Sequence, residues 1–123
     1  MNEKGENIVL EKSYKFALRI VKLYKYLTEM RKEFVISKQM LYSGTNAGAH
    51  VKGAQEAESR AGFFHEMNAA LQNASKCEFW LQLLRDGEFL DDKKFNSIHA
   101  DCSDPSPASE RFLIFFYFLT TGY

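Results

Sequence analysis

Residues 7–31 read NIVLEKSYKFALRIVKLYKYLTEMR, and this stretch decides the fold class. Its mostly apolar stripe recurs at alternating intervals of four and three residues, which places those side chains on one face of an α-helix. A second apolar row widens this face, as is typical of a helix in a bundle rather than in a two-stranded coiled coil. The stripe consists of Val9, Ser13, Phe16, Ile20, Leu23, Leu27 and Met30, with Phe34 one step beyond.

The same periodicity predicts two more helices, over residues 37–57 and 60–86. Ser37 is expected to be the N-cap of the second helix, and Gly87 follows the third in a place where glycine often ends a helix. Because the connectors are short, neighbouring helices are expected to be antiparallel. The stripe of the third helix consists of Phe63, Met67, Ala70, Ala74, Cys77, Leu81 and Leu84.

Glycines inside the second helix need a reason, since each costs about 1 kcal/mol relative to alanine. Gly44 and Gly48 are four residues apart and therefore share a face. We expect another helix to pack closely against them. The alternative is a loss of regular helix around Gly53.

A fourth helix is expected over residues 91–102, capped by Asp91 or Asp92. Two prolines then interrupt the pattern, and an apolar tail follows over residues 107–120. The sequence therefore predicts one all-α domain, an antiparallel up-down-up-down four-helix bundle whose fourth helix is broken or irregular after Cys102. Our hypothesis for the abrupt change is a shift of reading frame near Cys102, so that residues 103–123 are not the ancestral helix end.

Composition excludes several classes of protein. Sixteen basic and sixteen acidic residues give a formal net charge of zero, which argues against a generic polyanion binder. The longest apolar run, residues 112–119, would span roughly 12 Å as a helix, against the ~30 Å of a bilayer core. No apolar signal region follows the polar start, so we expect a cytoplasmic protein without a membrane segment.

One surface of the first helix is a candidate binding site. Lys12, Lys15, Arg19 and Lys22 lie within three turns on the side opposite the apolar stripe. Such a basic face can contact the phosphates of RNA or DNA. The alternative is an ordinary solvated helix face.

Candidates for catalysis or metal binding are few. His50, His65 and His99 fall on three different segments, and no Glu-x-x-His or His-x-x-x-His pair occurs. Cys77 lies on the apolar stripe, where a free thiol behaves as a small apolar residue. We therefore expect no catalytic residues, no metal, no cofactor and no small-molecule substrate.

Three stretches together resemble the four-helix-bundle family of 23S rRNA-intervening sequence proteins. They are FALRIVKLYKYL at residues 16–27, SGTNAGAH at residues 43–50 and AALQNASKCEFWLQLL at residues 69–84. The resemblance covers roughly residues 8–102. The sequence departs from the family pattern where His50 and Gly53 take the places of an Asn and a Glu, so the role of that pair is not carried over.

This resemblance implies a fold and an assembly rather than a reaction. Members look like antiparallel bundles that form rings, commonly pentamers, which makes a homo-oligomer the expected state of this chain. Some are encoded inside intervening sequences of bacterial 23S rRNA genes, and a related branch serves as a basic accessory partner of reverse transcriptases. No enzymatic activity is associated with the fold.

Two functions follow as hypotheses. The first is a non-catalytic oligomeric bundle that binds nucleic acid or a nucleoprotein through the basic face of the first helix. The alternative is a structural or protein-interaction module without a nucleic-acid role. It is supported by the zero net charge and by aromatic residues that we expect to be exposed, namely Phe64, Phe79, Trp80 and Phe89.

Overall fold

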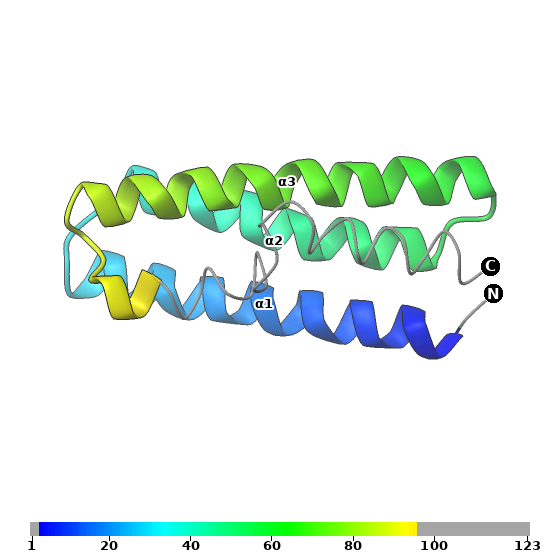
Figure 1. Cartoon of the computed structure of the whole chain (residues 1–123), viewed down its shortest axis with the longest axis horizontal. Helices are drawn as coiled ribbons and strands as arrows, with labels where there is room; N and C mark the ends of the chain where they lie inside the picture. Colours follow the sequence, from blue (N-terminus) through cyan, green and yellow to red (C-terminus); the bar gives the residue numbers. More distant parts are fainter. Residues whose placement is uncertain (1–2, 96–123) are drawn as a thin grey trace.

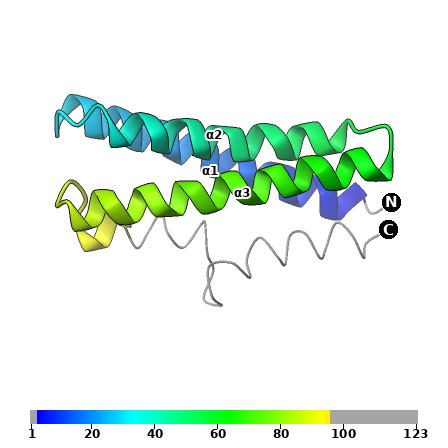
Figure 2. The same cartoon turned by 90° about the horizontal axis from the view of Figure 1, so that it is seen from above.

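A computed structural model describes residues 3–95 of the chain, with side chains for residues 9–95. Three α-helices run side by side along the long axis: α1 (Glu3–Glu29), α2 (Ile36–Gln55) and α3 (Arg60–Asp86) (Figure 1). The chain reverses direction at each connection, and a view from above shows the same antiparallel arrangement (Figure 2). The prediction of an all-α fold is confirmed, as is the antiparallel order of the first three helices.

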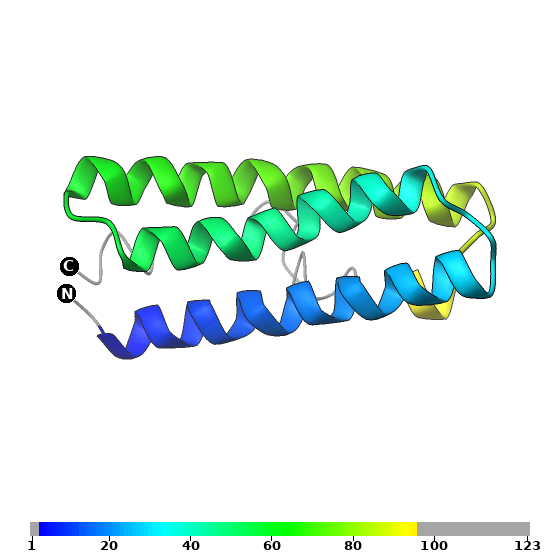
Figure 3. The same cartoon turned by 180° about the vertical axis from the view of Figure 1, so that it is seen from behind.

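Helix α2 contacts both of the other helices along the bundle. Helix α2 packs against both α1 and α3, whereas the backbones of α1 and α3 do not approach each other within the described residues. Seen from behind, α2 runs between them (Figure 3). The side of the bundle opposite α2 is therefore the natural place for a fourth segment.

Only the beginning of a fourth helix lies within the described residues. Residues 92–95 form one helical turn, and the backbone N–H of Lys94 donates to Oδ1 of Asp91 at 2.7 Å. Asp91 thus caps this turn, as expected. The remainder of the predicted helix to Cys102, the tail over residues 107–120 and the proposed change of reading frame lie outside the described residues.

Most of the predicted stripe forms the core. All seven stripe residues of α3 are buried, and so are five of the seven on α1. Met30 and Phe34, however, are exposed. The reason is that α1 ends at Glu29, two residues earlier than expected, and Lys32 adopts a left-handed conformation with φ of 57°. The chain therefore turns before either side chain can reach the core.

The start of α2 differs from the prediction in its capping residue. Val35, not Ser37, stands at the N-cap position and makes no side-chain capping hydrogen bond; the carboxylate of Glu33 accepts the first N–H groups instead. Its Oε1 accepts the N–H groups of Val35 and Ile36 at 3.0 and 2.8 Å, and its Oε2 accepts the N–H of Ser37 at 2.7 Å. The hydroxyl of Ser37 donates instead to the carbonyl oxygen of Glu33 at 2.8 Å. Ser37 is already inside the helix and cannot cap it.

The glycines of α2 lie where other helices come close. A Cβ at Gly44 would stand 2.9 Å from two carbons of Ile20, and a Cβ at Gly48 would stand 3.3 Å from the carbonyl oxygen of Ser13. Helix α2 continues without a break through Gly53 to Gln55, so the alternative of lost helix there is wrong.

Hydrogen bonds join the residues that follow α3 to Arg31, which follows α1. Gly87 follows α3 with φ of −80°, and the left-handed residue of this turn is Glu88 with φ of 68°. The guanidinium of Arg31 donates to the carbonyl oxygens of Glu88 and Phe89 at 2.7 and 3.2 Å. Within the described part of the chain, no helix is long and apolar enough to cross a membrane.

Candidate functional site

The basic face of α1, defined as Lys12, Lys15, Arg19 and Lys22, lies on the flank of the helix turned away from α2. Gly48 of α2 packs against Ser13 and Ala17, and the four basic residues lie on the other side of the helical wheel. The three lysines are exposed and Arg19 is half-buried. Their side chains therefore share one flank, as the spacing indicates.

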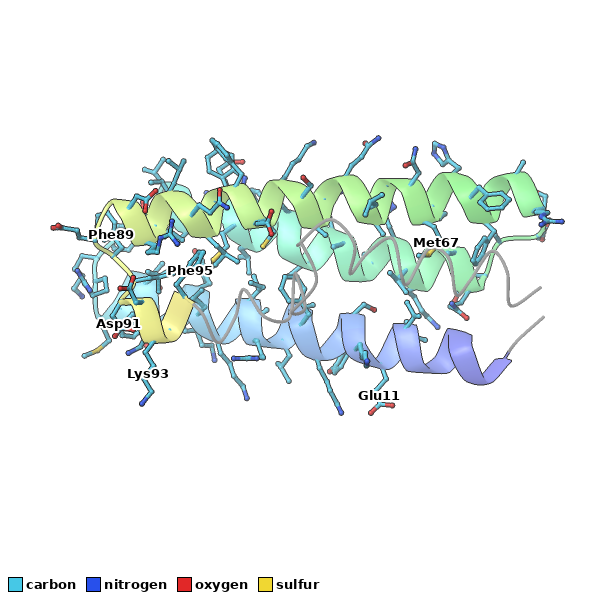
Figure 4. All side chains as sticks on the ribbon, viewed as in Figure 1. Glu11, Met67, Phe89, Asp91, Lys93 and Phe95 are labelled. Atoms are coloured by element: carbon cyan, nitrogen blue, oxygen red, sulfur yellow. The ribbon has the colours of Figure 1, made fainter. Side chains whose placement is uncertain are left out.

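The charge of this face is partly offset within α1. Lys15 Nζ lies 2.9 Å from Oε1 of Glu11, and both side chains are exposed. Glu11 points away from the bundle (Figure 4). The hydrogen bond and the charge of Lys15 hold the pKa of Glu11 below its ordinary value. Lys12 and Arg19 also take part in interactions. The face is thus not a row of four unpaired cations.

The middle stretches of α2 and α3 carry no charged residues. No Asp, Glu, Lys or Arg occurs from Gln39 to Val51 on α2, or from Met67 to Ser75 on α3. We call the joint outer surface of these helices the α2/α3 face. Its exposed and half-buried members are Gln39, Tyr42, Asn46, Ala49 and His50 on α2, and Glu66, Ala69, Gln72, Lys76, Phe79 and Leu83 on α3.

Large apolar side chains stand on one end of this face. Tyr42 is 52% exposed, Phe79 53% and Leu83 38%. The ring of Phe79 meets Trp80 edge to face, with centroids 5.1 Å apart, and Trp80 itself packs against the core. Phe79 is therefore held in an outward position rather than folded back onto the bundle.

The expected set of exposed aromatic residues is corrected by the structure. Of the four, only Phe79 is exposed, whereas Phe64, Trp80 and Phe89 are half-buried. Reasoning from sequence missed Tyr42. The absence of charged residues around Tyr42 on α2 is the signal that could have found it. A search for apolar stripes identifies buried residues and does not detect an exposed aromatic side chain.

His50 and Glu66 form a polar contact between α2 and α3. His50 Nδ1 lies 2.8 Å from Oε2 of Glu66, and both side chains are about one-third exposed, at 37% and 31%. Gly53 makes room for this contact, because a Cβ there would stand 2.8 Å from the same carboxylate oxygen. The carboxylate of α3 therefore occupies the space beside α2 that a side chain at residue 53 would fill.

Neither an ionised thiol nor a group of metal ligands occurs among residues 9–95. Burial raises the pKa of the Cys77 thiol to about 12, so it stays protonated near neutral pH. Among residues 9–95, no three His, Cys, Asp or Glu side chains come together as metal ligands. His99 and Cys102 lie outside this range.

Comparison with known proteins places the chain in a family. A model of the 23S rRNA-intervening sequence protein family matches residues 5–107. The chain belongs to this family. It is also similar to a crystal structure from Bacteroides thetaiotaomicron, described as a protein with unknown function from the S23 ribosomal protein family, at 39% identity and a TM-score of 0.84.

That likeness extends over nearly the whole of both members. The match covers 95% of this chain and 98% of the Bacteroides protein. No curated protein matches. Family membership therefore fixes the fold of the first three helices but brings no established function with it.

Proposed function

We propose that the chain is a non-catalytic helical bundle that works by binding macromolecules, and that it assembles with copies of itself through the α2/α3 face. The observation that carries this proposal is that exposed Tyr42, Phe79 and Leu83 lie in or beside stretches of α2 and α3 that carry no charged residue. A solvated helix normally carries charged residues on its outer face, as α1 does.

The energetics favour covering this surface. Burial of apolar area contributes about 25 cal/mol per Å², and charged side chains, which are costly to dehydrate, are scarce there. Depletion of charge with enrichment in aromatic residues is typical of the central part of protein interfaces. A surface without excess charge of one sign also does not repel a second copy of itself. The resemblance to ring-forming relatives supports a closed assembly, with a pentamer as the proposed size.

Sedimentation equilibrium over a range of protein concentrations tests this proposal. We expect the wild type to be oligomeric, and Phe79→Lys with Leu83→Lys to shift it to monomer, because two ammonium groups would have to be dehydrated. Met30→Lys is the matched control, since it replaces an exposed apolar side chain away from the face. A monomeric wild type, or equal dissociation of the control, would contradict the proposal.

Nucleic-acid binding through the basic face of α1 is the second candidate. The observation that favours it is that Lys12, Lys15, Arg19 and Lys22 share one flank of α1 on the side away from α2, where the three lysines are exposed. Assembly would repeat this face in every subunit, and phosphate contacts add.

A salt titration tests the second candidate. Retention of duplex DNA or structured RNA is expected at about 50 mM salt and should fall steeply by about 200 mM. Lys12→Gln with Lys22→Gln should weaken it, while Lys38→Gln with Lys52→Gln on α2 should not. If neither nucleic acid is retained at low salt, the nucleic-acid role is rejected and the assembly role stands.

A further inference from the structure

Positive charge is concentrated on α1. Residues 9–28 contain five basic side chains and one acidic one, although the whole chain has no formal net charge. We define the outer stripe of α1 as Glu11, Lys15, Leu18, Lys22 and Lys25, all of which are exposed. Each follows a residue of the core stripe by two positions, which places it on the opposite side of the helix. A partner that approaches this side therefore meets a cationic surface.

An exposed tyrosine borders the outer stripe. Tyr14 is 67% exposed and lies one helical turn before Leu18, which is itself 42% exposed. Leu18 is three residues from Lys15 and four from Lys22, so these side chains are neighbours on the helix surface. The surface therefore presents an aromatic ring and ammonium groups within reach of one ligand.

The other two tyrosines of α1 are already engaged. Tyr24 and Tyr26 are half-buried and pack against the core cluster. The ammonium nitrogen of Lys94 lies 5.0 Å from the centroid of the Tyr26 ring, so one face of that ring is occupied. Tyr14 is therefore the tyrosine of α1 whose ring is accessible to a ligand.

Single-stranded nucleic acid has the two chemical features that this surface matches. Its phosphates bind ammonium groups, and its unpaired bases stack on exposed aromatic rings. In a duplex the bases are stacked on one another, so a tyrosine on a helix surface meets only their edges or the sugar-phosphate backbone. Lys15 and Lys25 are about 15 Å apart along α1, which gives room for several nucleotides.

We propose that the outer stripe of α1 binds single-stranded nucleic acid, with Tyr14 stacking on a base and the three lysines of the stripe contacting neighbouring phosphates. This inference rests on the nucleic-acid role proposed above and names the class of ligand. At one end of the stripe Nζ of Lys15 lies 2.9 Å from Oε1 of Glu11. Lys22 and Lys25 are therefore expected to contribute more to phosphate binding than Lys15.

Fluorescence anisotropy of the full chain with a labelled oligothymidine of about 12 nucleotides, and with the matching duplex, tests the inference at about 50 mM salt. We expect the single strand to bind about tenfold more tightly than the duplex, because only its bases can stack on the tyrosine. Tyr14→Leu should remove this difference by weakening single-strand binding about tenfold, whereas Tyr14→Phe should bind like the wild type. Phe34→Leu is the matched control, since Phe34 is a 58% exposed aromatic residue outside the stripe.

The salt dependence separates stacking from charge. The logarithm of the affinity for a single strand falls against the logarithm of the salt concentration with a slope of about −0.7 for each phosphate contact. Lys22→Gln should reduce the size of this slope by about 0.7. Tyr14→Leu, in contrast, should lower the affinity and leave the slope unchanged. Circular dichroism verifies that each variant is folded.

The outcomes separate the inference from the proposal on which it rests. Equal affinity for the single strand and the duplex overturns the inference and leaves a nucleic-acid role intact. So does single-strand binding that Tyr14→Leu does not weaken, or that Phe34→Leu weakens to the same extent. If neither ligand is retained at low salt, the inference and the nucleic-acid role fail together.

Discussion

A methyl group added at Gly44 would have too little room. Its Cβ would stand 2.9 Å from both Cγ1 and Cγ2 of Ile20 and 3.2 Å from Sγ of Cys77, and both neighbours are fully buried. At Gly48 the nearest atoms are the Ser13 carbonyl oxygen at 3.3 Å and Cβ of Ala17 at 3.4 Å. Gly44 therefore has less room for a side chain than Gly48, although both lie where another helix approaches α2.

Gly44→Ala should destabilise the protein. Alanine gains about 1 kcal/mol in helix propensity, but overpacking against a stiff β-branched side chain costs about 1–3 kcal/mol. We expect a net loss of up to about 2 kcal/mol in the free energy of unfolding, measured by urea denaturation. Gly48→Ala is the control and should stay within about 1 kcal/mol of the wild type. A Gly44→Ala variant as stable as the wild type would show that Ile20 can move aside.

At the scale of an element, the start of α2 depends on a carboxylate outside the helix. Burial by itself opposes ionisation of Glu33, but the backbone N–H groups of Ile36, Ser37 and Val35 that donate to its carboxylate outweigh burial and lower the pKa of Glu33. The negative charge also meets the positive end of the α2 dipole.

Glu33→Gln should reveal this cap in the pH dependence of stability. Since the pKa of Glu33 is lower in the folded state, the unfolded state binds more protons as pH falls through the ordinary value of 4.5. The stabilisation is therefore complete above that value and is lost toward lower pH. Chemical denaturation at pH 7 should show a deficit of about 1–2 kcal/mol in the variant. A deficit that does not shrink below about pH 4 would contradict this account.

The cap also shows what the sequence could and could not predict about elements. Periodicity located α1, α2 and α3 because the core stripe continues along each helix. It did not identify the cap, since Ser37 satisfies the usual preference and Glu33 lies four residues before it. Nor did it pair His50 with Glu66, because that contact depends on the register between α2 and α3 and on the space left at Gly53. Contacts between helices are fixed by packing, which spacing along one chain does not specify.

At the scale of the whole molecule, substitutions at Phe95 and Phe79 should separate an effect on folding of one subunit from an effect on assembly. Phe95 is buried in the core cluster with residues of α1, α2 and α3, and the guanidinium carbon of Arg85 lies 4.3 Å from its ring centroid. Figure 4 shows Phe95 on the short turn that follows α3. The backbones of α1 and α3 do not come close, but their side chains share this cluster, and the turn adds Phe95 to it. Phe79, in contrast, is on the α2/α3 face.

Phe95→Ala and Phe79→Ala should therefore respond differently to protein concentration. Emptying the Phe95 site should cost about 3–5 kcal/mol at every concentration, because it leaves a cavity within one subunit. Phe79→Ala should cost the subunit little, but it should weaken assembly, and binding between native subunits stabilises them by mass action. Thermal unfolding of the wild type should thus shift to higher temperature as concentration rises, and this shift should persist in Phe95→Ala and diminish in Phe79→Ala. If the wild-type transition is independent of concentration, Phe79 faces solvent alone and the α2/α3 face is not an interface between copies.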